Sequence, residues 1–399
     1  MTVRPAIIIR RIGPYHRARL NALRAATEAV LAVEVCRQDE TYAWPHEPLP
    51  SHIARATLFN RQAEGRTIAA LRQRVEAALT TFAPDCVAVP GWAEPAGLMA
   101  LQWARRRGVP VILMSDSQMH DAPRRRLTEW PKRAVVRCAG AGFAAGPTSR
   151  DYLVQLGMAP HTIALGYDAV DNAHFCRGAE AARCTPGVRE RLGLPARYVI
   201  AVARFVPQKN LLTLVGAYNE ARRRGLVEAD LVIVGEGPER PALQALEGPG
   251  VSICPFADND RLPALYGLSD GLILPSLVEP WGLVVNEAMA ASRPVIVSDR
   301  AGAAPALVED GVNGFVCPPT HEGLMAAMAR LARADVEAMG EAAAARIAQW
   351  DLDRFVQGFR AAAGIAAARE RGRPGRLRHL RRLSGPPLGV MARLVGALS

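Results

Sequence analysis

Short apolar runs alternate along the chain with longer segments whose apolar residues recur at helical spacing. The runs are rich in Val, Ile and Leu and are bounded by Gly, Pro, Asp or Ser, which is typical of strands buried in a parallel sheet. The predicted strands are residues 6–9, 86–89, 109–114, 198–202, 231–234, 251–254, 271–274 and 294–297. The helices predicted between them include residues 61–79, 211–224, 240–246 and 323–334. The fold class is therefore α/β.

The alternation of strand and helix occurs twice, before about residue 160 and again after about residue 195. Such alternation predicts doubly wound sheets with right-handed crossovers, so we expect two Rossmann-like domains. We place them at 1–165 and 196–350, with a linker at 166–195 and a C-terminal segment at 351–399. Ligands of such folds bind at the carboxyl ends of the strands, so a deep cleft between the domains is the expected site.

Charge is unevenly distributed along the chain. Its 399 residues include 49 Lys+Arg and 38 Asp+Glu, a formal net charge of +11. The net charge is +9 over 1–165, −5 over 166–350 and +7 over 351–399. A positive net charge is common in nucleic-acid-binding proteins. No helix-turn-helix, zinc or RNA-binding signature is present, however, so we expect no nucleic-acid partner. The basic tail 369–382, followed by apolar 386–398, fits peripheral contact with an anionic membrane and fits a solvated tail equally well.

Seven scattered cysteines and the absence of long apolar stretches indicate a cytoplasmic protein. No CxxC pair occurs and no His lies at zinc-ligand spacing from a Cys pair, so reduced thiols are expected. No secretory signal is recognised, and no apolar stretch reaches the length of about 18 residues that a membrane-spanning helix needs. We therefore expect a cytoplasmic location, with association to the inner face of the membrane as an open alternative.

The segment 274–290, LPSLVEPWGLVVNEAMA, carries the most specific chemistry. It is predicted to run from a strand end through a short loop into a helix that begins near Trp281, and the free N–H groups of a helix start form an anion site. Glu279 and Glu287 flank that start. Two acids do not suit an anion, but carboxylates accept hydrogen bonds from vicinal sugar hydroxyls. The segment therefore predicts a ligand with phosphate in its middle and hydroxyl-rich rings at both ends.

The Glu-x7-Glu arrangement Glu279…Glu287, set in PSLVEPWGLVVNEAMAASRPVIVSDRAGAAPALVEDGVNGFVCPP, resembles the donor site of glycosyltransferase family 4, the retaining GT-B enzymes of "glycosyl transferases group 1" type. Three further segments share the resemblance, which covers about residues 198–320: RFVPQKN at 204–210, GEGP at 235–238 and LYGLSD at 265–270. The first domain matches only in general layout. The resemblance implies an N-terminal acceptor-binding domain, a C-terminal donor-binding domain and a C-terminal helix that packs back on the first.

The resemblance also implies roles for residues of the second domain. Arg204 and Lys209 would hold the donor diphosphate and stabilise the charge that grows on the leaving nucleotide. Glu279 would bind the hydroxyls of the transferred sugar, and Glu287 those of the ribose. Further donor-binding candidates are Gly235, Gly237, Phe256, Trp281, Gly282 and Leu283, together with Gly13 of the first domain. The two glycines of 235–237 fit an ordinary turn as well, and Phe256 fits a packing role nearly as well.

Candidates in the first domain are less specific. Relatives commonly carry a His after the strand 109–114, where this chain has Asp116, so Asp116 and His120 are both candidates for the polar group near the anomeric carbon. Helix capping is the alternative for Asp116. His16 is an acceptor-binding candidate, and inverting GT-B enzymes often have a base His at this point. Arg124 and Arg125 would face an anionic acceptor or simply water.

A metal is not expected. Asp258-Asn259-Asp260 spells a DxD, the metal motif of the other large transferase fold, but capping of the following helix is the simpler interpretation. With Arg204 and Lys209 supplying positive charge, the transfer would need neither a metal ion nor another cofactor.

Taken together, the sequence and the resemblance predict a metal-independent, retaining glycosyltransferase of hexosyltransferase type. It would move a sugar from a UDP- or GDP-sugar to the hydroxyl of a sugar or lipid-linked acceptor, in bacterial polysaccharide, lipopolysaccharide or glycolipid biosynthesis. An inverting GT-B transferase and a sugar-nucleotide epimerase remain alternatives, and a non-catalytic nucleotide-sugar or polyanion-binding protein is a further one. A dinucleotide-dependent redox enzyme lacks support, because no GxGxxG follows the first strand.

Overall fold

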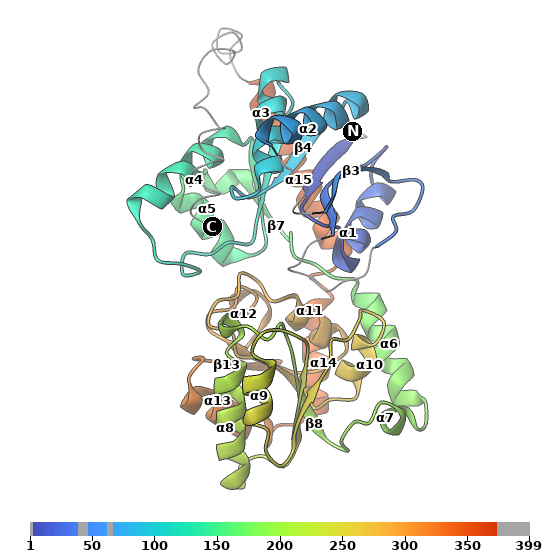
Figure 1. The fold of residues 1–399 in the computed structure, drawn as a ribbon, viewed down its shortest axis with the longest axis vertical. Helices are drawn as coiled ribbons and strands as arrows, with labels where there is room; N and C mark the ends of the chain where they lie inside the picture. Colours follow the sequence, from blue (N-terminus) through green and yellow to red (C-terminus); the bar gives the residue numbers. More distant parts are fainter. Residues whose placement is uncertain (1–2, 39–46, 62–66, 373–399) are drawn as a thin grey trace. The chain divides into compact units, whose positions relative to one another are not determined.

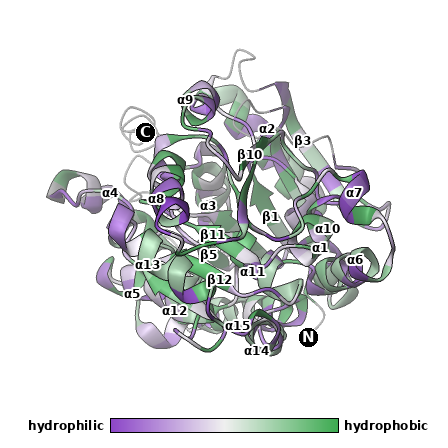
Figure 2. Ribbon diagram, turned by 90° about the horizontal axis from the view of Figure 1, so that it is seen from below, coloured by the Kyte–Doolittle hydropathy of each residue, from purple (hydrophilic) through white to green (hydrophobic). Residues whose placement is uncertain are grey.

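The computed structural model describes residues 3–38, 47–61 and 67–372, which form two compact units (Figure 1). The first unit extends to Asp168 and resumes at Leu352, and the second unit is Ala169–Asp351. Each is built around one parallel sheet, so the α/β prediction is confirmed. Figure 2 shows the strands inside both units coloured as hydrophobic, in agreement with their burial.

The first unit contains a seven-stranded sheet with the order β3-β2-β1-β4-β5-β6-β7. Its strands are β1 (Pro5–Ile9), β2 (Leu31–Gln38), β3 (Ala54–Arg61), β4 (Cys86–Pro90), β5 (Val111–Ser115), β6 (Ala141–Ala144) and β7 (Ile163–Leu165). Its helices are α1 (Pro14–Ala25), α2 (Ile68–Phe82), α3 (Pro95–Arg107), α4 (Arg126–Cys138), α5 (Pro147–Gln155) and α15 (Leu352–Arg371), with a 3-10 turn at Pro160–Thr162. Every residue of β1 is buried, as an apolar run at the centre of a covered sheet requires.

Helix α15 completes the first unit although it follows the whole second unit in sequence. It packs on α1 and on strands β5, β6 and β7. Phe355 and Phe359 on this helix lie 5.4 and 6.1 Å from the Phe143 ring of β6, measured between ring centroids. Gly358 lets the helix approach closely, because a Cβ there would lie 2.3 Å from the Leu165 carbonyl oxygen. The predicted membrane contact of the tail concerns residues that lie largely outside the described ones.

The second unit contains a six-stranded sheet with the order β10-β9-β8-β11-β12-β13. Its strands are β8 (Tyr198–Val202), β9 (Asp230–Val234), β10 (Val251–Cys254), β11 (Gly271–Leu274), β12 (Val295–Ser298) and β13 (Gly314–Cys317). Its helices are α6 (Asn172–Cys184), α7 (Val188–Arg191), α8 (Leu211–Arg223), α9 (Arg240–Ala245), α10 (Leu262–Gly267), α11 (Leu283–Ala290), α12 (Ala304–Leu307), α13 (His321–Leu331) and α14 (Val336–Ile347), with the 3-10 turn η2 at Pro207–Lys209.

All eight predicted strands are present, and five further strands were not predicted. Strands β2 and β3 interrupt their apolar pattern with charged residues, β6 is a run of mostly small residues, and β7 is only three residues long. The helix predicted over 61–79 begins only at Ile68. Arg61 ends β3, and the Thr67 side chain accepts a hydrogen bond from the Ala70 N–H at 3.1 Å, which caps the helix.

The stretch 166–195, expected to be a linker, contains helices α6 and α7. Helix α6 packs on α10 and α11 within the second unit. Small residues permit this packing, because a Cβ at Gly178 would lie 2.5 Å from Pro263. The polar and Gly/Pro-containing composition of this stretch suggests a linker, but its residues form a helix that belongs to the second unit. Among the described residues, no helix has the combination of length and apolar character that crossing a membrane would require.

Candidate functional site

The structure brings together two of the predicted donor-site residues of the second unit. Lys209 lies at the end of η2, and Glu279 lies in the loop between β11 and α11. The Lys209 ammonium forms an ion pair with Glu279 Oε2. The same oxygen accepts a hydrogen bond from Ser276 Oγ at 3.0 Å, and Glu279 is only 8% exposed. The site is thus a largely buried carboxylate that is held by an ammonium group and a hydroxyl.

Main-chain and amide contacts fix the loop of Lys209 against the loop of Glu279. Asn210 adopts a left-handed conformation with φ of +57°, and its side-chain amide donates to the carbonyls of Pro275 at 3.1 Å and Pro319 at 2.9 Å. The Leu277 N–H donates to the Gln208 carbonyl at 2.8 Å. These bonds join three segments, so the fold holds the loop of Lys209 beside the loop of Glu279.

Helix α11 begins two residues later than predicted, at Leu283, with Gly282 as the preceding cap residue. Gly282 has φ of +100°, and a Cβ there would lie 2.7 Å from Leu274 Cδ2, so only glycine fits this turn without strain. Trp281 lies before the helix and inside the unit: its indole N–H donates to Asn286 Oδ1 at 2.9 Å, and its ring stacks on Trp350 at 5.5 Å. The Trp281 side chain therefore supports the helix start, and a contact of this residue with a donor stays a prediction.

Glu287 lies in the second turn of α11 and is fully buried, with 0% exposure. The Tyr266 hydroxyl donates to Glu287 Oε2 at 2.8 Å. A solvent-facing helix residue, the alternative to a ribose ligand, is excluded by this burial. Neither Ser276 nor Tyr266 was singled out from the sequence; both stand within the matched segments, but only the fold shows that they contact the two acids.

The glycine turn after β9 packs closely on the loop that follows β8. A Cβ at Gly235 would lie 1.9 Å from the Ala203 carbonyl oxygen, and one at Gly237 would lie 2.5 Å from the Phe205 carbonyl oxygen. The turn can therefore lie directly on the loop that carries Arg204, which is exposed just after β8. Phe256 is half-buried after β10. A contact of these residues with a nucleotide stays a prediction.

The first acid of the DxD segment holds the turn before α10, a helix whose own cap residue, Arg261, makes no side-chain cap hydrogen bond. Asp258 Oδ1 accepts hydrogen bonds from the N–H groups of Asp260 at 3.2 Å and Arg261 at 2.9 Å, directly before α10. Within the described part of the chain, no three His, Cys, Asp or Glu side chains gather as a metal site would need. Metal independence of the reaction remains a prediction.

In the first unit, His16 lies in the first turn of α1, whose cap residue is Gly13. The Gly13 N–H donates to His16 Nδ1 at 3.3 Å, so Nδ1 carries no proton. Desolvation, and next the charge of Arg19, lower the pKa of His16 to about 3. The positive end of the helix dipole acts in the same direction. The imidazole is therefore neutral at physiological pH.

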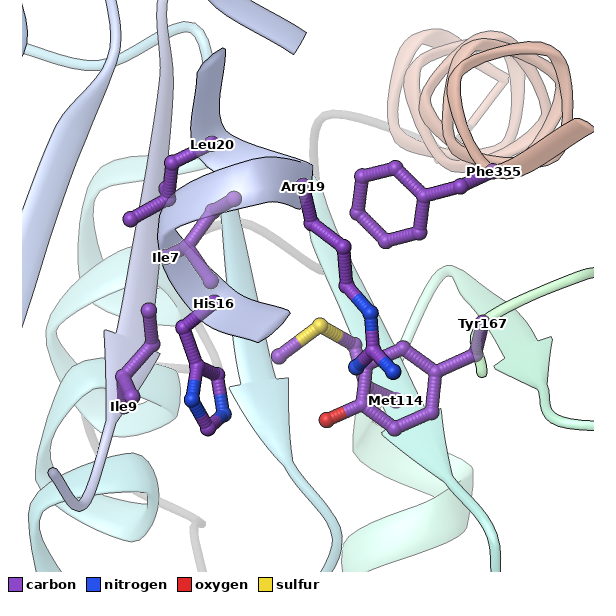
Figure 3. A pocket seen from close by; sticks show the side chains of 8 residues that line it. All are labelled: Ile7, Ile9, His16, Arg19, Leu20, Met114, Tyr167 and Phe355. Carbon is purple, nitrogen blue, oxygen red and sulfur yellow. The ribbon is translucent and has the colours of Figure 1, made fainter. Parts of the chain in front are cut away.

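Beside His16 lies a small cavity of about 20 Å³, room for about one water molecule (Figure 3). Its walls are mostly apolar side chains of β1, β5, α1 and α15, namely Ile7, Ile9, Leu20, Met114 and Phe355. Arg19 crosses it with its guanidinium 5.3 Å from the Tyr167 ring centroid, and Arg19 Nη2 donates to Asp168 Oδ1 at 3.1 Å. Sequence reasoning missed this buried pair, although Arg19 shares the apolar face of α1 with Leu20 and Leu23.

Asp116 directly follows β5 and is half-buried. Desolvation, and next the nearby charge of Asp168, raise the pKa of Asp116 to about 7, against a smaller lowering effect of Arg19. A carboxyl group that titrates near neutrality can exchange a proton at working pH, which is a property of many catalytic groups. His120 lies exposed in the same loop.

Asp116→Asn is expected to stabilise the protein at alkaline pH. Because the folded state keeps this proton to higher pH than the unfolded chain, its contribution to stability is lost as pH rises from about 4 through about 7. The melting temperature of Asp116→Asn should therefore exceed that of the wild type by a few degrees near pH 8 and match it near pH 4. Asp151→Asn, at an exposed position of α5, should show no such difference; an equal effect in both variants would contradict the assignment.

The structure gives Arg124 contacts within the first unit. Its guanidinium lies 4.3 Å above the Tyr152 ring, and it donates to the Tyr152 hydroxyl at 2.7 Å and to the main-chain carbonyl oxygens of Gln118 and Met119. Through these contacts Arg124 holds the loop after β5, and its binding of an acceptor stays a prediction. Arg125 is exposed.

Two family models match this chain. Residues 196–334 match the model described as glycosyl transferases group 1, and residues 12–166 match the glycosyl transferase 4-like domain. The two matched regions lie in the second and the first unit respectively. Together they include every candidate site residue discussed above.

Individual relatives carry related names. Alpha-D-kanosaminyltransferase of Streptomyces kanamyceticus is 31% identical over 56% of this chain and 61% of its own length. GDP-mannose-dependent alpha-(1-6)-phosphatidylinositol monomannoside mannosyltransferase of Mycobacterium tuberculosis is 34% identical over 46% of this chain and 51% of its own length. The chain thus matches only about half of the length of these curated relatives.

Among solved structures, that of Anabaena HepE in complex with UDP is similar to this chain with a TM-score of 0.68. The sequence identity is 18%, and the similarity covers 90% of this chain and 98% of HepE. At this identity the likeness concerns the fold alone. It confirms the expected GT-B class, with its two Rossmann-like domains.

Proposed function

Since the chain belongs to the family of glycosyl transferases group 1, we propose that it transfers a sugar from a nucleotide-diphosphate sugar to an acceptor hydroxyl, with retention of configuration. The observation that carries this proposal is the cluster of Lys209, Glu279 and Ser276, in which a buried carboxylate lies next to an ammonium group on a rigid support.

The cluster suits a donor with both phosphate and hydroxyl groups. An ammonium group has three N–H donors, so Lys209 can keep one on Glu279 and offer others to a diphosphate. The second oxygen of Glu279 is then the acceptor for hydroxyls of the transferred sugar. Arg204, exposed after β8, adds a second positive charge for the phosphates. Glu287 is assigned to the ribose hydroxyls; because its carboxylate is fully buried, this contact requires a conformational change that exposes it.

The proposed reaction needs no nucleophile from the protein. The bond between the anomeric carbon and the phosphate oxygen breaks, and the acceptor oxygen forms its bond to the same carbon from the same face. The departing phosphate takes the proton of the acceptor hydroxyl, while Lys209 and Arg204 stabilise its charge. The neutral imidazole supports an acceptor-binding role for His16, and the near-neutral pKa of Asp116 supports a role for its carboxyl group near the anomeric carbon.

The substrates are proposed by class. The name of the HepE structure records UDP, and that of the mycobacterial relative records GDP-mannose and a phosphatidylinositol glycolipid. We therefore assign a UDP- or GDP-sugar as donor and a sugar or lipid-linked acceptor, in polysaccharide, lipopolysaccharide or glycolipid biosynthesis. The enzyme would work in the cytoplasm and reach lipid-linked acceptors by peripheral contact with the membrane.

A panel of UDP- and GDP-sugars tests this proposal. We expect release of the nucleoside diphosphate from one donor, stimulated by an acceptor and unchanged by EDTA, together with an acceptor product that has the same anomeric configuration as the donor in its NMR spectrum. An inverted product would contradict the retaining mechanism in favour of an inverting transferase. Conversion of the donor sugar without transfer would indicate an epimerase, and loss of turnover in EDTA would show that a metal is needed.

A further inference from the structure

The outer face of helix α4 in the first unit exposes two large apolar side chains side by side. Leu127 is 87% exposed and Trp130 is 62% exposed, the highest values among the exposed large hydrophobic residues of the described chain. Side chains three residues apart on a helix are neighbours on its surface. Figure 1 shows α4 at the margin of its unit.

Positive charges continue the same face. Arg133 and Arg137 follow Trp130 by three and seven residues and are exposed, and exposed Arg125 precedes the helix. Glu129, the acid of this helix, is turned inward: Lys132 Nζ lies 2.8 Å from its Oε1, and the Tyr152 hydroxyl donates to it at 3.0 Å. The described side chains exposed on α4 are therefore apolar or cationic. We define Arg125, Leu127, Trp130, Arg133 and Arg137 as the α4 face.

The opposite side of the helix is firmly anchored. Val135 and Val136 belong to the hydrophobic core of the first unit. Lys132 lies 5.6 Å from the centroids of the Trp92 and Tyr152 rings, and these two rings pack edge to face. The α4 face is therefore held in place by its own unit, and its exposed Trp and Leu are not explained by local packing.

We propose that the α4 face docks the protein on an anionic lipid surface, with Leu127 and Trp130 entering the interface and the arginines on lipid phosphates. This deepens the membrane contact in the proposed function, on which it rests for its biological purpose. Trp is favoured at the headgroup level, and Arg carries its charge to phosphates while its stem stays in apolar surroundings. Each cation near an anionic leaflet adds to the attraction.

Charge complementarity favours an anionic membrane as the partner of the α4 face over a second copy of the chain and over the C-terminal residues 373–399. A second copy docked through the same face would oppose arginines to arginines. The C-terminal residues 373–399 contain six arginines and no acid, so they are repelled by the α4 face. An apolar area of two side chains is also small for a stable protein–protein interface. An anionic membrane offers both the opposite charge and an apolar interior.

Vesicle co-sedimentation of the full chain tests the proposal. We expect binding to vesicles of phosphatidylcholine with phosphatidylglycerol and little binding to phosphatidylcholine alone. Leu127→Ser with Trp130→Ser should weaken the partition coefficient about tenfold or more, as should Arg133→Glu with Arg137→Glu. The matched control is Leu246→Ser with Val312→Ser, which removes two exposed apolar side chains of the second unit and should bind as the wild type does. Circular dichroism should show equal melting for all variants.

Three outcomes would overturn the proposal: unchanged vesicle binding of the Leu127/Trp130 double variant, equal binding of the wild type to neutral vesicles, or a change from dimer to monomer on substitution in light scattering. Deletion of 373–399 that alone abolishes binding would assign the contact to the tail instead. Nucleotide release from the donor should be the same in wild type and double variant. A wild type that binds vesicles but transfers no sugar would refute the proposed function and leave the docking face intact.

Discussion

Lys209→Ala is expected to lower kcat/KM by about 100- to 1,000-fold, the usual loss when one charge-stabilising donor is removed from a preorganised site. In the absence of donor the ammonium holds Glu279 Oε2, and with donor bound it would also contact the phosphates. The charge on the leaving phosphate grows as the glycosidic bond breaks, so most of the loss should appear in kcat rather than in KM. Steady-state kinetics on the donor identified by the panel measures both.

Two further variants separate charge from structure at this site. Lys209→Ala leaves the largely buried Glu279 without its counter-charge, which by itself destabilises the site. Lys209→Gln keeps a hydrogen-bond donor for Glu279 but removes the charge, so it should lose nearly as much activity with a smaller change in melting temperature. Arg197→Ala is the control, because it breaks an exposed ion pair with Asp270 in the same unit and should change activity by less than about twofold. Wild-type turnover in Lys209→Gln would contradict the role assigned to Lys209.

The sequence predicts the architecture well where burial is purely apolar. Strands such as β1 and β8 are runs of apolar residues that are buried over all or nearly all of their length. The prediction fails for β2 and β3, because Glu34 and Arg55 interrupt the apolar pattern and compensate each other only across two strands. A pattern along one segment cannot show a partner on another segment.

At the candidate site, too, the sequence identifies the segments but not the contacts between them. The segments that carry Lys209 and Glu279 are recognisable in the sequence, but the two side chains are 70 positions apart and their ion pair follows only from the fold. The run of three arginines at 124–126 gives no sign that Arg124 turns inward, since Tyr152, on which it stacks, lies 28 residues further along. Conversely, the exposure of Leu127 and Trp130 departs from what an amphipathic helix in a folded unit normally does, and that departure is the reason to assign them a partner.

A buried carboxylate holds the loop that precedes α1. Glu34 on β2 is 1% exposed, and its Oε1 accepts a hydrogen bond from the Ile12 N–H at 3.0 Å. Its Oε2 accepts from Arg55 Nη2 at 2.6 Å, from Arg55 Nε at 3.1 Å and from Thr57 Oγ1 at 3.0 Å. Glu34 thus joins β2 and β3 to the segment that leads to Gly13 and His16 in the first turn of α1.

Glu34→Ala is expected to destabilise the first unit by about 3–5 kcal/mol, because it leaves a buried guanidinium without a counter-charge and a buried N–H without an acceptor. For a unit of this size that loss corresponds to a fall in melting temperature of roughly 10 °C, measured by calorimetry. Glu76→Ala, which breaks a surface ion pair with Arg106 in the same unit, should change it by less than about 1 kcal/mol.

The combination Glu34→Leu with Arg55→Met should recover much of the lost stability, because an apolar pair removes both unpaired charges. It should not recover the positioning of the loop, since the Ile12 N–H still lacks its acceptor. If His16 binds the acceptor, this double variant should therefore fold near the wild-type melting temperature and still show a raised KM for the acceptor, with an unchanged KM for the donor. A double variant that melts as low as Glu34→Ala would mean that packing around Glu34, and not its charge, holds these strands together.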